Sequence, residues 1–231
     1  GALISRLLGQ NRKDEARRVS VFSLYLGILI AAVFSVVMGV FMKPILGLLG
    51  AGTNTYEYAR QYAFCVIVFG GIPTVLSNVL SNLIRSIGRS REAGAGIILG
   101  GLLNIALDPL FMFVLLPDGY EVLGAGLATA LSNCIACVFF LVVLIRMGGG
   151  SVITFSLKAG MAEKASIAAV FAVGIPSAVA TFLFDLDYVV IDKLMVSYHD
   201  LALAAIRLVL KVERFPLNVG IGLCQGMLPL V

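Results

Sequence analysis

Several apolar segments of this chain are each long enough to cross a lipid bilayer. A transmembrane helix needs about 20 predominantly apolar residues. We expect six such helices, over residues 19–42, 57–84, 93–117, 122–145 and 166–196 and from residue 201 onward. The strands of a membrane barrel alternate between apolar and polar residues, and these segments do not. The sequence therefore predicts an all-α fold, a polytopic membrane helical bundle.

The composition separates this chain from soluble helical proteins. Hydrophobic residues make up 60% of it and charged residues 13%, against about 45–50% and about 25% in soluble domains. A soluble protein of this size could bury a few apolar helices, but it would not need repeated charge-free segments of about 20 residues. The net charge of +4 does not indicate nucleic acid as a partner, because the positive residues are distributed as membrane topology requires.

The basic residues gather in alternate loops between the predicted spans. One side of the membrane would hold Arg6, Arg12, Lys13, Arg17, Arg18, Arg85, Arg89, Arg91, Arg146, Lys158 and Lys164. The other side has only Lys43, Arg60 and Lys193, together with an acidic turn at Asp118. Loops rich in Lys and Arg stay in the cytoplasm. The sequence thus predicts a multi-pass protein of the plasma membrane with its basic loops in the cytoplasm.

The predicted span over residues 93–117 contains a carboxylate, a carboxamide and a proline. Asn104 and Asp108 are four residues apart, so they lie on the same face of a helix. Pro109 has no N–H and leaves the Ile105 carbonyl without its helical partner. A charge at this depth costs about 2.5–3.5 kcal/mol and therefore faces a bundle interior or a water-filled cavity. This pattern predicts a cation-binding or proton-binding site; the alternative is that both side chains only tie helices together.

The predicted span over residues 166–196 carries three further acidic residues. Asp185 and Asp192 are seven residues apart and share a helix face with Tyr188 between them, and Asp187 is a neighbour. A carboxylate and an aromatic ring together attract a lipophilic organic cation. We favour a functional role for Asp185, and for Asp192 we favour simple solvation near the membrane surface.

Three basic residues near the start of the last predicted span, Arg207, Lys211 and Arg214, share one helix face. They either snorkel to the membrane surface or line an aqueous cleft. An ion pair between this face and Asp185 or Asp187 would be structural. The sequence has no nucleophile–base pair, phosphate loop or cluster of metal ligands, so we expect neither an enzyme nor a cofactor.

Four short motifs, in their order and spacing, resemble the multidrug and toxic compound extrusion (MATE) transporters: ISRLLG at 4–9, LIRSIG at 83–88, NIALDP at 104–109 and GAGLAT at 124–129. The resemblance covers essentially the whole chain and implies twelve spans in two six-span lobes. The chain would then be a piece of a longer one. Residues 1–146 would run from the end of the second span to the sixth, 147–165 would form a cytoplasmic linker, and 166–231 would hold the truncated seventh and eighth spans.

The resemblance also implies the positions of two sites. The family's N-lobe cation site maps onto Asn104, Asp108 and Thr129, which would bind Na⁺ if the transporter is sodium-coupled. Its fourth contributor, an Asp on the first span, lies outside this sequence. Some branches of the family have an acidic residue near the middle of the first helix of the second lobe, and Asp185 is the closest match to it. We expect Asp185, Asp187 and Tyr188 to bind substrate.

The implied function is a bacterial secondary active multidrug exporter, a monomer that moves amphipathic organic cations outward in exchange for Na⁺ or H⁺ by alternating access. One alternative is a lipid-linked oligosaccharide flippase of the same superfamily, which the basic face of Arg207, Lys211 and Arg214 keeps open. The other alternative is a membrane scaffold without transport activity. A scaffold would have no reason to keep Asp108 at mid-membrane depth.

Overall fold

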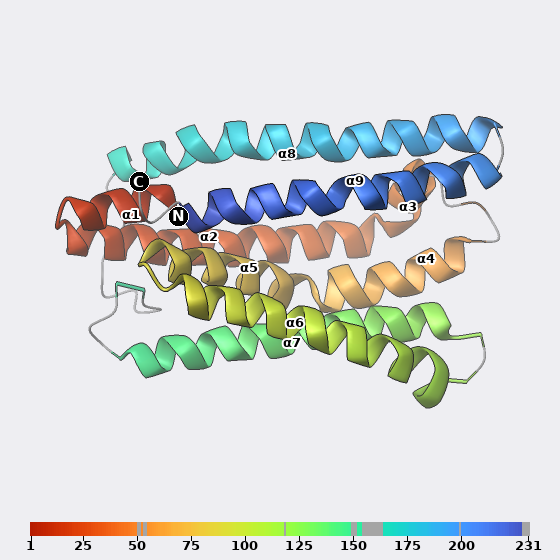
Figure 1. The fold of residues 1–231 in the computed structure, drawn as a ribbon, viewed down its shortest axis with the longest axis horizontal. Helices are drawn as coiled ribbons and strands as arrows, with labels where there is room; N and C mark the ends of the chain where they lie inside the picture. Colours follow the sequence, from red (N-terminus) through yellow and green to blue (C-terminus); the bar gives the residue numbers. More distant parts are fainter. Residues whose placement is uncertain are drawn as a thin grey trace. The chain divides into compact units, whose positions relative to one another are not determined.

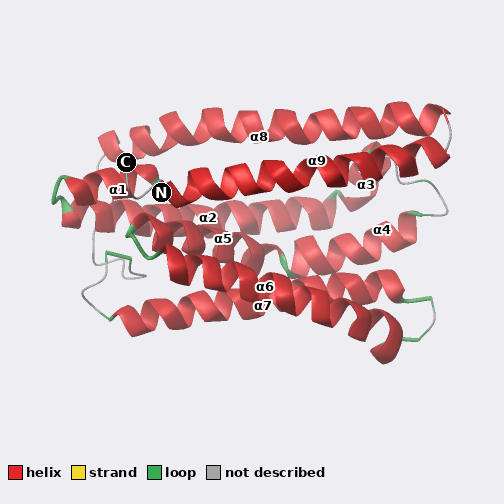
Figure 2. Cartoon of the chain, viewed as in Figure 1, coloured by secondary structure: helices red, strands yellow, loops and turns green. Residues whose placement is uncertain are grey.

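The computed structural model describes residues 1–49, 52, 55–117, 119–148, 152–153, 164–198 and 200–227. These residues form helices joined by loops, with no strand among them (Figure 2). The all-α prediction is therefore confirmed. The chain divides into two compact units, Gly1–Ala162 and Glu163–Val231. Asp118, Lys158 and most of residues 147–165 lie outside the described residues.

The first unit is a helical bundle in which successive long helices run in opposite directions (Figure 1). Its α-helices are α1 (Ala2–Gly9), α2 (Lys13–Val40), α3 (Met42–Leu48), α4 (Tyr56–Ala63), α5 (Gly71–Ser86), α6 (Ser90–Leu110) and α7 (Glu121–Met147). Helix α5 packs against α2, α6 and α7, and α6 packs along α7. The bundle interior therefore lies around α5 and α7, where Leu80, Ile84 and Phe140 are fully buried.

The second unit consists of two helices, α8 (Lys164–Tyr198) and α9 (Asp200–Met227), which pack against each other. Their described side chains are mostly exposed within this chain. Helix α8 matches the predicted span over residues 166–196 closely.

Four stretches of the described chain are apolar and long enough to cross a membrane: Lys13–Val40, Ser90–Leu115, Glu121–Met147 and Lys164–Met195. The bent pair Tyr56–Phe69 and Gly71–Ser86 would make a fifth. Helix α9 is not among them, because Lys211, Glu213 and Arg214 interrupt its apolar sequence. The sixth expected span is therefore a helix of sufficient length that carries three charged residues near its middle.

The second span is bent where the sequence predicts a kink. Pro73 follows Gly70 and Gly71, and such a run favours a break in a helix. In the structure the helix bends by 51° between Tyr56–Phe69 and Gly71–Ser86. The last part before the bend, Phe64–Phe69, is π-helical, and such segments are frequent at functional sites.

A second π-helical segment, Phe111–Leu115, follows Pro109 at the end of α6. It is packed against the start of α7, where small residues allow a close approach. A Cβ atom on Gly124 would lie 2.8 Å from the Phe111 carbonyl oxygen. The glycine at position 124 thus allows the backbone of this segment to approach α7 closely.

Candidate functional site

Asn104 of α6 connects a carboxylate on its own helix to a hydroxyl group on α7. Its Nδ2 atom donates to Asp108 Oδ1 at 3.2 Å and to Thr129 Oγ1 at 3.2 Å. The four-residue spacing on α6 produces the first contact, and the packing of α6 along α7 produces the second. The structure thus brings together the three residues that we expect to form a cation site.

The direction of these hydrogen bonds follows from the Thr129 hydroxyl group. That hydroxyl donates to the Ala125 carbonyl at 2.9 Å on its own helix, so its lone pairs are available to accept from Asn104. Both hydrogens of the Asn104 amide nitrogen are then used. Within the described chain, neither Asn104 Oδ1 nor Asp108 Oδ2 takes part in a hydrogen bond.

The remaining oxygen lone pairs suit a small, hard cation or a proton. Asn104, Asp108 and Thr129 are all half-buried, and together they offer amide, carboxylate and hydroxyl oxygens, which hard cations prefer. Among the described residues, no three His, Cys, Asp or Glu side chains lie close enough to hold a metal ion. A cation at this position would therefore be held by one carboxylate and neutral oxygens.

A cavity of about 480 Å³ lies between α8 and α9 in the second unit. Its polar lining includes Asp185, Tyr188, Arg214 and Asn218. Asp187 is exposed and does not line this cavity, because a residue two positions from Asp185 points to another side of the helix. The structure brings Asp185 and Tyr188 together and leaves Asp187 apart.

The Tyr188 ring already has a cationic neighbour within the chain. The Arg214 guanidinium carbon lies 4.2 Å from the ring centroid, a distance typical of a cation–π contact. The sequence indicates the face on which Arg214 lies, but not its partner on α8. An aromatic ring cannot be matched with a basic residue of another helix before the packing of the two helices is known.

Asp192 forms a solvent-exposed ion pair with Arg207. Arg207 Nη2 lies 3.1 Å from Asp192 Oδ2, and Arg207 Nε donates to Oδ1 at 3.4 Å. The basic face of α9 is thus paired with Asp192, and neither Asp185 nor Asp187 pairs with it in the described chain. The antiparallel packing of α8 on α9 brings the end of α8 to the start of α9.

Comparisons with known proteins find a family model and curated relatives that match this chain. The MatE family model matches residues 1–110, which include Asn104 and Asp108. The chain is 30% identical over 234 residues to the multidrug export protein MepA of Staphylococcus aureus, a match that covers 100% of the chain and 50% of that protein. Residues 1–110 thus match the MATE family, and the whole chain is similar to a multidrug export protein. The chain spans about half the length of the curated relatives that it matches.

Solved structures of MATE proteins have the same fold. An inward-facing multidrug resistance MATE family transporter is 28% identical and superposes with a TM-score of 0.68, covering 75% of this chain and 38% of that chain. An outward-facing one is 22% identical, with a TM-score of 0.81 over 99% of this chain and 49% of that chain. The family match and the apolar helices support a multi-pass membrane protein, and the proteins that the chain resembles are transporters rather than enzymes.

Proposed function

We propose that this chain is part of a secondary active multidrug exporter, which moves amphipathic, cationic compounds out of the cell in exchange for Na⁺ or H⁺. The observation that carries the proposal is the contact of Asn104 with both Asp108 and Thr129, at 3.2 Å each. The name of the MepA relative, a multidrug export protein, supports the export of drugs. The coupling ion and its site are our inference from the residues of α6 and α7.

The coupling depends on the free energy of Asp108 in its two states. An uncompensated carboxylate at membrane depth is costly, and a bound cation or proton removes that cost. Ion binding therefore favours the conformation in which Asp108 is sheltered, whereas substrate binding must favour the other conformation. Without such a difference between the two conformations, no coupling would result.

Two coupling ions are compatible with this group of residues. A Na⁺ ion would use lone pairs of Asp108, the Asn104 amide oxygen and the Thr129 hydroxyl. A proton would bind Asp108 itself, and the protonated carboxyl group could then donate to the Asn104 amide oxygen once the amide has rotated. Either ion competes with the hydrogen bond from Asn104 to Asp108. The contact between α6 and α7 would thus respond to ion loading.

For the substrate site we propose the cavity between α8 and α9 that Asp185 and Tyr188 line. Its volume of about 480 Å³ lies in the range of drug-sized pockets. Asp185 would supply the negative charge and Tyr188 an aromatic surface for an organic cation. Asp187 is exposed and outside the cavity lining, and would act only through its charge.

The distribution of charge supports an orientation with the basic loops in the cytoplasm. In the first unit, the α1–α2 loop, the α5–α6 loop and the end of α7 lie at the same end of the bundle (Figure 1). These segments carry most of the basic residues: Arg6, Arg12, Lys13, Arg17, Arg18, Arg85, Arg89, Arg91 and Arg146. We propose that this end of the bundle faces the cytoplasm of a bacterial cell.

Transport by the reconstituted full-length protein tests the proposal. A fluorescent cationic dye inside vesicles is followed while a Na⁺ gradient or a pH gradient is imposed. We expect one gradient to drive export, Asp108→Asn to abolish gradient-driven export, and Asp108→Glu to retain part of it. Glu92→Gln is the matched control, because it removes a carboxylate from the exposed first turn of the same helix.

Two results would count against this function. Export by Asp108→Asn at the rate of the native protein would remove the assigned coupling site. Movement of a lipid-linked oligosaccharide, with no gradient-driven movement of any dye, would favour the flippase instead.

A further inference from the structure

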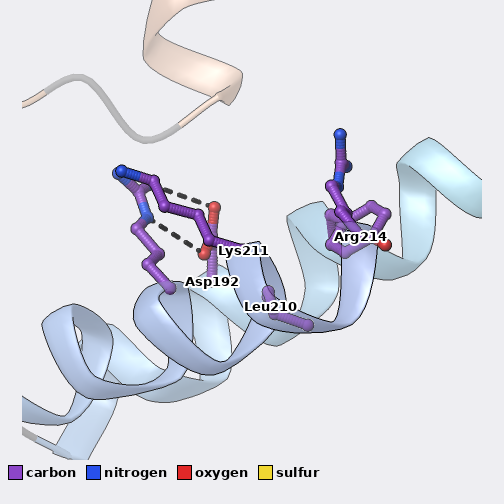
Figure 3. Close-up of a pocket in the computed structure, with 6 residues that line it drawn as sticks. Asp192, Leu210, Lys211 and Arg214 are labelled. Atoms are coloured by element: carbon purple, nitrogen blue, oxygen red, sulfur yellow. Dashed lines mark hydrogen bonds and ion pairs between the residues drawn. The ribbon is translucent and has the colours of Figure 1, made fainter. Parts of the chain in front are cut away.

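A second cavity between α8 and α9 has a basic lining (Figure 3). Its volume is about 300 Å³, and it is lined by Tyr188, Asp192, Arg207, Leu210, Lys211 and Arg214. Three of these side chains are cationic and one is a carboxylate. We propose that this basic cavity binds the acidic group, a carboxylate or a phosphate, of an amphipathic ligand.

The carboxylate in the basic cavity neutralises only one of the three cations. Asp192 holds Arg207 in a two-point contact, with nitrogen–oxygen distances of 3.1 Å and 3.4 Å. This pair fixes the Arg207 guanidinium at one end of the cavity. The cavity therefore keeps two positive charges that Asp192 does not balance.

Those two charges belong to Lys211 and Arg214. Lys211 lies one helical turn after Arg207 and one turn before Arg214, so all three follow one face of α9. Figure 3 shows Lys211 extending toward the Asp192 end of the cavity, while Arg214 stands at the other end. In the described chain neither residue has a carboxylate partner, and Arg214 rests on the Tyr188 ring. An anionic group in the cavity would be attracted by both positive charges.

The basic cavity adjoins the larger cavity that contains Asp185. Tyr188 and Arg214 line both of them. The larger cavity adds the apolar side chains of Phe184, Leu217 and Ile221. A ligand that fills both cavities would place its apolar body among these side chains and its acidic group near Lys211 and Arg214.

The combined charges point to a zwitterionic substrate. Asp185 lies in the same cavity as Arg214, so a ligand with a single positive charge would be attracted by one and repelled by the other. A molecule with both an amine and an acid satisfies both side chains. This inference rests on the proposed export function for its role in transport, but the binding itself can be measured separately.

Two rhodamine dyes that differ only in one group provide the test. One carries a free benzoate and the other its methyl ester, and both keep the cationic ring system. Their binding to the full-length protein is measured by fluorescence anisotropy. We expect the free acid to bind about tenfold more tightly than the ester, which corresponds to one favourable charge contact.

Variants of the basic cavity should change only the binding of the acid. Lys211→Gln should weaken it about tenfold, Lys211→Arg should restore most of it, and neither should change ester binding. Lys193→Gln is the matched control, because it removes the same charge from an exposed position outside the cavity lining. Equal binding of the two dyes, or an equal loss in Lys193→Gln, would overturn the proposal.

The acidic group could come from an exported zwitterion or from the head group of an anionic lipid, and transport distinguishes the two. Gradient-driven export of the acid dye that falls in Lys211→Gln supports a substrate site. Displacement of the dye by phosphatidylglycerol, with export unchanged in Lys211→Gln, supports a lipid site. If the ester is exported but the protein binds the acid no more tightly than the ester, the exporter function stands and this inference fails.

Discussion

The Thr129 hydroxyl on α7 accepts a hydrogen bond from the Asn104 amide on α6, and the same amide donates to Asp108. A change in the charge of Asp108 would therefore alter the hydrogen bond between Asn104 and Thr129, which joins the two helices. Since α6 and α7 pack against each other, a rearrangement of this contact offers a route from ion loading to helix movement.

Replacing the Thr129 hydroxyl should weaken ion coupling without unfolding the protein. Thr129→Val keeps the shape and removes the acceptor, which leaves a half-buried Asn104 N–H without its partner, at a cost of about 1–3 kcal/mol. We expect about tenfold weaker apparent affinity for the coupling ion in vesicle transport, and near-native affinity for Thr129→Ser. Equal transport by Thr129→Val and the native protein would show that the hydroxyl has no part in coupling.

Adding a methyl group at Gly124 should destabilise the first unit. The added Cβ would lie 2.8 Å from the Phe111 carbonyl oxygen and 3.1 Å from the Met112 backbone nitrogen, and backbone atoms cannot rotate aside. Gly124→Ala should therefore cost about 1–3 kcal/mol, measured by thermal unfolding in detergent. Gly101→Ala on α6 is the control, because nothing lies within 4 Å of its added Cβ. Equal unfolding temperatures for the two variants would contradict the close approach.

The Ser35 hydroxyl on α2 forms a hydrogen bond with the π-helical segment Phe64–Phe69. It donates to the Ile67 carbonyl at 2.9 Å, from α2 to the bent span. Ser35→Ala should lower stability by about 0.6 kcal/mol, the average for hydrogen bonds between membrane helices, and by no more than about 1.7 kcal/mol, the largest value for such bonds. Ser177→Ala is the comparison, since that hydroxyl donates to Val173 on its own helix. A loss no larger in Ser35→Ala than in Ser177→Ala would mean that the contact between the helices contributes nothing.

The sequence predicts the parts of this structure that depend on local pattern. Long apolar segments indicate α2, α6, α7 and α8 because a bilayer sets their length and polarity. The four-residue spacing of Asn104 and Asp108 is also a local pattern. It places the two side chains on one face because the helix repeat determines which residues are neighbours.

Contacts between helices could not be predicted from local sequence pattern. Thr129 enters the site through the packing of α7 on α6, and the sequence pointed to it only by resemblance to a family. The sequence leaves open an ion pair between the basic face of α9 and Asp185 or Asp187, and in the structure Arg207 pairs with Asp192. The choice among three carboxylates on α8 depends on how far α9 is shifted along it, which no periodicity within one helix specifies.

Neutralising Asp192 should make the basic cavity bind acids more tightly. Asp192→Asn removes the carboxylate that holds Arg207, so three cationic side chains would face the cavity without a counter-charge. Stability should change by less than about 1 kcal/mol, because the side chains of the pair are 34% and 59% exposed, and such pairs contribute little. Affinity for the benzoate dye should rise about threefold to tenfold, while affinity for its methyl ester should stay level or fall. Raising the salt concentration should reduce this gain, because salt screens exposed charges. Weaker binding of the acid by Asp192→Asn would mean that the ion pair shapes the cavity rather than limiting its charge.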